Sequence, residues 1–157
     1  TYRGVEITGK ADRIDRLPDG SLGIVDYKTG APPSKKQVEQ GFAMQLGTLG
    51  LMVQLGAYEA ARATPTVFEY WSLGKNKESD TGFGYVETPL KTGGARTGVL
   101  PDEFLPAARG FLDEALDKWI LGDEGFTARL NPAAKVYASY DHLMRLDEWM
   151  GREEDGG

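Results

Sequence analysis

The sequence predicts an α/β fold, and three observations support this prediction. Segments rich in β-branched and aromatic side chains, which are typical of strands or extended chain, lie at residues 2–9, 11–17, 22–28, 67–73 and 85–88. Residues 34–63 have the apolar composition of a long buried helix, and residues 101–121 have the spacing of an amphipathic one. The chain has 157 residues and 40% hydrophobic content, which suits a single domain with one core.

A tight hairpin joins the strands at 11–17 and 22–28. The loop residues 18–20 read Pro-Asp-Gly, which suits a type I turn followed by a glycine in the left-handed region. This three-residue loop sets Leu17 opposite Ser21 and, counting back, Asp12 opposite Asp26. A two-residue loop would shift the register by one and turn Asp12 to the other face of the sheet.

The end of the second strand carries a candidate reaction centre. Asp26 and Lys28 point to the same face, because alternate side chains of a strand do so. Asp12, directly opposite Asp26, would bring a second carboxylate within about 5 Å, measured between Cβ atoms. Two such carboxylates repel unless one is protonated or a cation lies between them, and a divalent metal is the simpler solution. The alternative is that Asp26 and Lys28 form an exposed surface ion pair of little consequence.

The ligand chemistry favours Mg²⁺ or Mn²⁺, because the chain has no cysteine and a single histidine, His142. Such a metal polarises a phosphoryl group and lowers the pKa of a bound water, and Lys28 would orient that water or offset charge on the phosphate. The site therefore predicts phosphodiester hydrolysis. Hydrolysis of another phosphoester shares this geometry and stays open.

The motifs resemble a known family. The spacing Gly9-x-x-Asp12, the segment Ile24-Val-Asp-Tyr-Lys-Thr-Gly30 and a glutamine on the next helix resemble the RecB-like branch of the PD-(D/E)XK nucleases. The sequence of residues 9–30, 67–73 and 137–152 looks most like the C-terminal nuclease domain of AddB proteins of the alphaproteobacterial type. The resemblance implies a restriction-endonuclease-like core with a central mixed β-sheet flanked by helices. It also implies that residues 1–157 are one nuclease domain of a larger protein, with residues 151–157 frayed.

The resemblance assigns roles to five residues. Asp12 and Asp26 would bind the metal together with the backbone carbonyl of Tyr27. Lys28 would be the catalytic lysine, and Gln45 would hold the substrate strand or the lysine.

The chain also departs from the family pattern. Leu49 occupies the tyrosine position of the family's Q-x-x-x-Y motif, and the upstream helix that supplies a further metal ligand in many relatives is not found. Iron-sulfur members of the family carry three cysteines near the end of the domain, where this chain has Tyr137, Tyr140 and Leu146. Without cysteine we expect no iron-sulfur cluster.

The resemblance and the residues together predict function. We expect a Mg²⁺- or Mn²⁺-dependent deoxyribonuclease of the exonuclease type, acting on single-stranded DNA during double-strand break processing for recombinational repair. Its partner would be an AddA-type helicase-nuclease, and its place the cytoplasm, since no apolar run suits a membrane. The formal net charge of −6 argues against a general nucleic-acid-binding surface. The alternative is a catalytically weak or degenerate nuclease fold that serves as a structural or DNA-guiding module.

Overall fold

The structure is a computed structural model that describes residues 1–58 and 63–125. The elements, in chain order, are β1 (Arg13–Arg16), β2 (Leu22–Lys28), α1 (Lys35–Glu39), α2 (Gln45–Gln54), β3 (Pro65–Lys75), β4 (Phe83–Glu87), α3 (Phe104–Ala115) and the π-helical turn η1 (Leu116–Ile120). The chain divides into two compact units, Thr1–Glu114 and Ala115–Gly157, and the whole sheet lies in the first. The expected packing of Tyr137, Tyr140 and Leu146 and the frayed tail at 151–157 lie outside the described residues.

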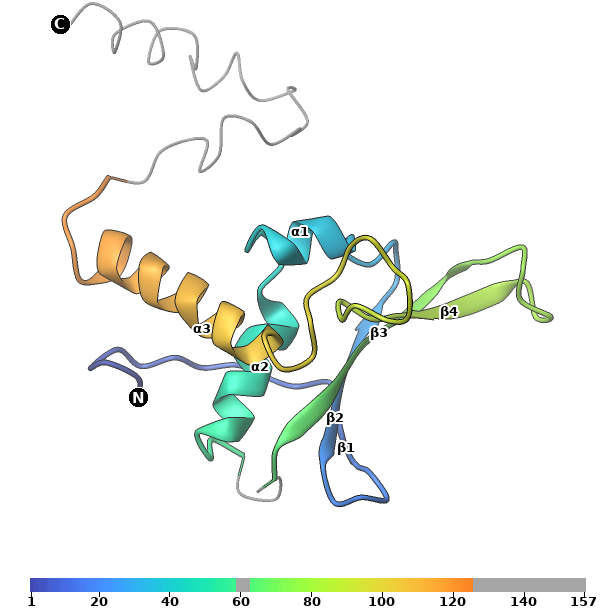
Figure 1. Ribbon diagram of the computed structural model, residues 1–157, viewed down its shortest axis with the longest axis horizontal. Coiled ribbons are helices and arrows are strands. Elements are labelled where there is room, and N and C mark those ends of the chain that lie inside the picture. Colours follow the sequence, from blue (N-terminus) through green and yellow to red (C-terminus); the bar gives the residue numbers. More distant parts are fainter. Residues whose placement is uncertain (59–62, 126–157) are drawn as a thin grey trace, which may run out of the picture. The chain divides into compact units, whose positions relative to one another are not determined.

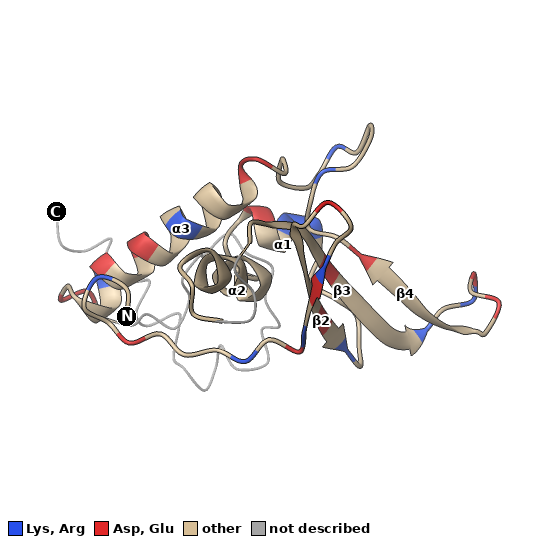
Figure 2. Cartoon of the chain, turned by 90° about the horizontal axis from the view of Figure 1, so that it is seen from below, with Lys and Arg blue, Asp and Glu red and all other residues tan. Residues whose placement is uncertain are grey.

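The four strands form one mixed sheet, as the sequence predicted (Figure 1). Their order is β1-β2-β3-β4, with β2 and β3 parallel and the two outer pairs antiparallel. Parallel neighbours need a long crossover connection, and here it carries α1 and α2. The three α-helices lie on one side of the sheet in both Figure 1 and Figure 2, and the charged positions of α3 lie on the side of that helix away from α2.

The predicted hairpin is confirmed in its register. The pairs run from Arg13 with Val25 to Arg16 with Leu22, and the Leu17 N–H donates to the Ser21 carbonyl at 2.9 Å. Gly20 has φ 85°, the left-handed value that the three-residue loop requires. The strand β1 is shorter than expected, because its ladder begins at residue 13.

The single helix predicted over residues 34–63 is wrong. It begins as expected, with a capping box between Ser34 and Gln37, but α1 ends at Glu39. Gly41 then adopts φ 76°, which a helix cannot continue through, and the chain starts a second helix at Gln45. Gly56, with φ 80°, follows the end of α2 in the same way.

Two further boundaries differ from the prediction. Residues 2–9 are not a strand: they contain only an isolated bridge between Tyr2 and Val5, because Arg3 and Gly4 form a turn with positive φ. The helix predicted over 101–121 is present as α3, which begins at residue 104, and as the π-helical turn η1. The π-helical turn is closed by a hydrogen bond from the Leu121 N–H to the Leu116 carbonyl at 2.8 Å.

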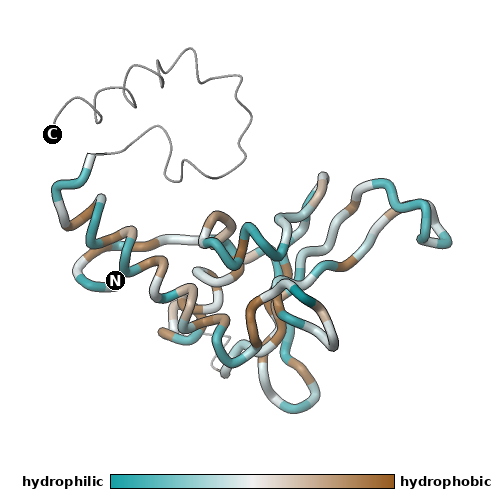
Figure 3. The backbone as a smooth tube through the Cα atoms, turned by 45° about the horizontal axis from the view of Figure 1, so that its top comes forward, coloured by the Kyte–Doolittle hydropathy of each residue, from teal (hydrophilic) through white to brown (hydrophobic). Residues whose placement is uncertain are grey.

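The core lies between the sheet and the helices. Phe68 and Tyr70 of β3 alternate with exposed or half-buried residues, as the sequence predicted, and they pack with Leu46 and Leu49 of α2. α2 approaches its neighbours closely at Gly50, where an added Cβ would lie 2.6 Å from a leucine side chain of α3. Figure 3 shows apolar residues along the central strands and a hydrophilic tip on the β3–β4 hairpin.

The opposite face of the sheet carries a smaller cluster of side chains. Tyr27 packs edge-on against Trp71, with ring centroids 5.9 Å apart, and the Arg13 guanidinium lies 5.0 Å from the Trp71 ring centre. The Trp71 indole N–H donates to Glu69 at 2.7 Å. No helix within residues 1–58 and 63–125 is long and apolar enough to cross a membrane.

Candidate active site

The candidate site lies at the carboxyl end of β2, next to the start of α2. The strand enters through the buried apolar residues Leu22 and Ile24, so the next residue on the same face, Asp26, is also buried, with 3% of its side chain exposed. Lys28, one step further along that face, is 27% exposed. The strand therefore holds a carboxylate beneath the surface and an ammonium group at its edge, as the sequence predicted.

Asp26, Lys28 and Gln45 form a closed set of polar contacts, which we call the Asp26 cluster. The Lys28 ammonium lies 2.7 Å from Asp26 Oδ2 and donates to Gln45 Oε1 at 2.7 Å. The Gln45 amide nitrogen donates to Asp26 Oδ1 at 2.5 Å. Each member thus contacts the other two, and the sequence-based pairing of Gln45 with Asp26 and Lys28 is present.

The break between α1 and α2 is what brings Gln45 to the strand. Gln45 is the first residue of α2, so its side chain leaves the helix at its amino-terminal end. The next residue, Leu46, is fully buried in the core and fixes the rotation of the helix about its axis. Leu49, which occupies the position of the motif's tyrosine, is also a core residue, with 4% exposure.

Asp12 lies one position beyond the last pair of the β1–β2 ladder. Its carboxylate Oδ2 accepts a hydrogen bond from the backbone N–H of Tyr27 at 3.0 Å. Every second pair of an antiparallel ladder is hydrogen-bonded, and Leu17 with Ser21 is such a pair, so a continued ladder would give the Tyr27 N–H to the backbone of residue 11. The Asp12 side chain takes this N–H instead, and it is thereby held against β2 beside the Asp26 cluster.

The donor atoms at this end of β2 suit a hard divalent cation. Asp26 Oδ2 is buried and, although it lies 2.7 Å from the Lys28 ammonium, it accepts no hydrogen bond of proper geometry. The described part of the chain contains no group of three acidic, histidine or cysteine side chains. Mg²⁺ needs only one or two carboxylates, because water and phosphate oxygens complete its shell, so two carboxylates and a backbone carbonyl fit this metal.

Tyr70 is a site residue that the sequence did not single out. It is the direct partner of Asp26 on β3, and the Lys28 ammonium lies 5.6 Å from the centre of its aromatic ring. Burial, with a contribution from the Asp26 charge, raises the pKa of Tyr70 to about 12. The alternating pattern of β3 did predict that Tyr70 is buried, and a buried tyrosine hydroxyl usually needs a partner, which was the available signal.

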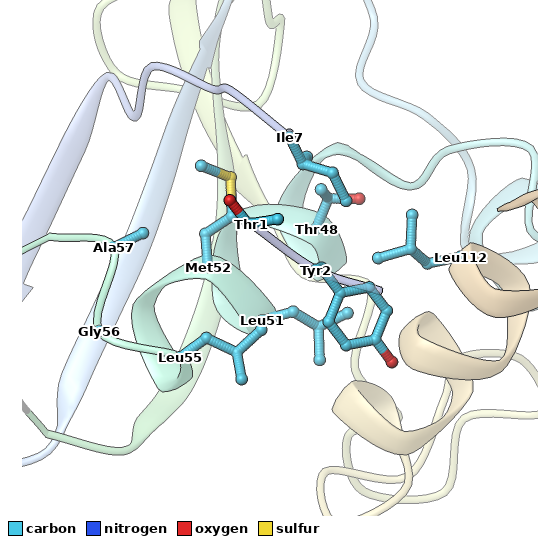
Figure 4. A pocket seen from close by; sticks show the side chains of 10 residues that line it. All are labelled: Thr1, Tyr2, Ile7, Thr48, Leu51, Met52, Leu55, Gly56, Ala57 and Leu112. Carbon is cyan, nitrogen blue, oxygen red and sulfur yellow. The ribbon is translucent and has the colours of Figure 1, made fainter. Parts of the chain in front are cut away.

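A separate apolar pocket of about 280 Å³ lies on another side of α2 (Figure 4). Its walls come from the N-terminal segment, α2, the turn after it and α3, including Tyr2, Leu51, Met52 and Leu112. No residue of the Asp26 cluster lines it. The pocket contains no charged side chain, so the candidate chemistry stays with the strand end.

The fold and the site together define a nuclease-type α/β protein: a mixed sheet places an acid and a lysine, two residues apart, at the end of a central strand. The chain belongs to the PD-(D/E)XK nuclease superfamily, whose family model matches residues 1–136. This match confirms the restriction-endonuclease-like fold that the motifs implied.

Individual relatives match the chain over different lengths. An uncharacterized protein of Rickettsia felis is 30% identical over 163 aligned positions, which cover 90% of this chain and 19% of that protein. The AddB component of the ATP-dependent helicase/deoxyribonuclease of Streptococcus agalactiae is 48% identical over 54 residues, or 34% of this chain and 4% of that protein. The protein of the same name from Streptococcus mutans is 47% identical over 62 residues, or 39% of this chain and 5% of that protein. No solved structure matches the chain.

Proposed function

We propose that this chain is a Mg²⁺- or Mn²⁺-dependent deoxyribonuclease domain that hydrolyses phosphodiester bonds of single-stranded DNA, with exonuclease action. The observation that carries the proposal is the Asp26 cluster, which combines a buried carboxylate with an adjacent ammonium group at the end of β2. A structural ion pair on the surface needs neither the burial of Asp26 nor the glutamine that contacts both partners.

The wider role follows from the relatives' names. Two streptococcal relatives are named as components of an ATP-dependent helicase/deoxyribonuclease, and the chain spans a twentieth or less of their length. We place this domain in an AddB-type protein that works with an AddA-type helicase-nuclease partner in the cytoplasm, where double-strand breaks are processed for recombinational repair. The helicase of such a complex would deliver the single strand that the domain cuts.

Asp12, Asp26 and the carbonyl of Tyr27 are the residues that would hold the metal. When bound, the metal would supply charge for the phosphoryl oxygens and lower the pKa of a water. Asp26 would contribute Oδ2, which is buried and lacks a hydrogen bond, while the Gln45 amide keeps Oδ1 in place. The Tyr27 N–H would keep the Asp12 carboxylate at the strand.

Lys28 would change its partner during this process. Its ammonium now lies 2.7 Å from Asp26 Oδ2, the same atom that a metal would use, and two cations at one oxygen repel each other. The ammonium would therefore leave Oδ2 and turn to the scissile phosphate, whose developing negative charge it would stabilise. Since Lys28 is already 27% exposed, its ammonium can reach the substrate without opening the core.

A second function, a structural or DNA-guiding module with little activity, is favoured by one specific observation. The Asp12 carboxylate is engaged with a backbone N–H, and within the described residues no third acid joins the two proposed ligands. A domain of this kind would keep the fold and bind its partners without cutting DNA at a measurable rate.

A cleavage assay decides between the two. The chain is incubated with end-labelled single-stranded DNA in Mg²⁺, in Mn²⁺ or with a chelator, beside Asp26→Ala and a matched control, Asp15→Ala. Asp15 is an acid of β1 that pairs with Arg13 outside the Asp26 cluster. Metal-dependent cutting that Asp26→Ala abolishes and Asp15→Ala retains supports the nuclease. Absence of cutting, both alone and in complex with an AddA-type partner, supports the structural module.

A further inference from the structure

Two buried side-chain polar atoms in residues 1–58 and 63–125 have no hydrogen-bond partner, and they belong to neighbouring residues. They are Asp26 Oδ2 and the hydroxyl oxygen of Tyr70. Asp26 and Tyr70 are direct partners in the parallel pairing of β2 with β3, so their side chains leave the sheet on the same face. One atom is an acceptor and the other carries a proton that it can donate.

The Tyr70 hydroxyl has no evident structural purpose. The side chain is 1% exposed and packs in the core beside Phe68, where a phenylalanine would fill the same space without burying an unpaired hydroxyl. Burying a polar group without a partner is unfavourable, so such groups in folded proteins usually have a bound water or a functional role. Because the pKa of Tyr70 is raised to about 12, the group keeps its proton at neutral pH and acts as a donor.

The position of the aromatic ring points to the site. The Lys28 ammonium lies 5.6 Å from the centre of the Tyr70 ring and 2.7 Å from Asp26 Oδ2, so the ring lies close to the contact between the ammonium and the carboxylate. When Lys28 turns to a phosphate, Asp26 Oδ2 loses the charged group beside it. A second donor on the same face would then keep the carboxylate in place.

We propose that Tyr70 is a positioning residue of this site, whose hydroxyl donates to a buried water that in turn donates to Asp26 Oδ2. A water needs two or more polar partners to be held in such a place, and the hydroxyl and the carboxylate oxygen supply them. The water fixes the orientation of the Asp26 carboxylate toward the metal while Lys28 contacts the substrate. This inference rests on the proposed nuclease function.

The test is Tyr70→Phe, with Tyr58→Phe as the matched control. The Tyr58 hydroxyl donates to the Gly9 carbonyl at 2.9 Å, so its removal deletes a hydrogen bond that exists, far from Asp26 in sequence. Three quantities are measured for each variant and the unsubstituted chain: the denaturation midpoint in urea, the Mn²⁺ dissociation constant by calorimetry, and kcat and KM on single-stranded DNA.

For Tyr70→Phe we expect an unchanged or higher denaturation midpoint, Mn²⁺ binding or kcat weakened about 10- to 100-fold, and an unchanged KM, as for the loss of a group that orients a metal ligand. For Tyr58→Phe we expect a lower midpoint with unchanged Mn²⁺ binding and kcat. A Tyr70→Phe variant with normal Mn²⁺ affinity and kcat, or with a clearly lower midpoint, overturns the inference while an active unsubstituted chain keeps the nuclease proposal. An unsubstituted chain that neither binds Mn²⁺ nor cuts DNA overturns both.

Discussion

Replacing Lys28 with methionine tests the electrostatics of the site most directly. The change removes an ammonium group 2.7 Å from Asp26 Oδ2 and keeps a side chain of similar length. The Asp26 carboxylate, 3% exposed, then keeps only the hydrogen bond from Gln45. Breaking a fully buried ion pair costs about 3–5 kcal/mol, but Lys28 is 27% exposed and water can partly replace it. We therefore expect the free energy of unfolding to fall by about 1–3 kcal/mol.

Metal should reverse this loss. In the variant a divalent cation meets a bare carboxylate, whereas in the unsubstituted chain it must first displace the ammonium, so Mn²⁺ should bind the variant at least as tightly. A ligand at about 100 times its dissociation constant adds about 2.7 kcal/mol to the free energy of unfolding, which is enough to offset most of the expected loss. Cleavage should nevertheless fall about 100-fold or more, because the phosphate loses a positioned positive charge.

The assay is urea denaturation followed by tryptophan fluorescence, without metal and at saturating Mn²⁺, together with calorimetric Mn²⁺ titrations. Lys36→Met is the matched control, because Lys36 is an exposed residue of α1 outside the Asp26 cluster. We expect no metal-dependent change in its stability relative to the unsubstituted chain. A Lys28→Met variant whose stability deficit is the same with and without Mn²⁺, or whose Mn²⁺ binding is weaker, refutes the competition between ammonium and metal.

The hairpin loop, the core and the buried hydroxyl each give one more prediction. Deleting Asp19 shortens the hairpin loop to two residues and should turn Asp12 to the other face of the sheet, so Mn²⁺ affinity and cleavage should both fall while the circular dichroism of the fold is kept. Gly50→Ala places a Cβ 2.6 Å from a leucine side chain of α3 and should lower the free energy of unfolding in urea by about 1–3 kcal/mol, with Gly110→Ala, which meets no atom within 4 Å, as the unharmed control. The pKa of Tyr70 is raised from 10.0 to about 12 in the folded chain, so above pH 10 the unfolded chain releases this proton first and the folded state loses stability. The free energy of unfolding should therefore fall by up to about 3 kcal/mol between pH 10 and 12 through this group alone, a loss that Tyr70→Phe escapes, and equal losses in the two proteins would contradict this.

The hairpin shows how much a sequence can predict when turn chemistry is specific. The Pro-Asp-Gly loop has one favourable length, and that length sets the register of every pair from Arg16 with Leu22 to Arg13 with Val25. The shared face of Asp26 and Lys28, and the contact of both with Gln45, followed from the same pattern and from the family motif. These features depend on local conformation, which a single sequence specifies well.

The parts that differed depend on tertiary packing. Gly41 could have been an ordinary residue inside a helix, and only its position against Phe111, where an added Cβ would lie 2.7 Å from that ring, shows why the chain bends there. The Asp12 carboxylate replaces a backbone acceptor at the end of the ladder, which no spacing rule indicates. The alternation in β3 predicted that Tyr70 is buried but could not show that its hydroxyl has no partner.

The bend at Gly41 separates the aim of Gln45 from the length of the chain before it. In one continuous helix, each residue inserted between β2 and Gln45 would rotate that side chain by about 100° about the helix axis. Here α2 starts afresh after the glycine, and its rotation is set by Leu46 in the core, so residues 29–40 can lengthen or shorten without turning the glutamine away from the strand. This stretch is therefore the natural place to insert a tag or a sensor peptide close to the site.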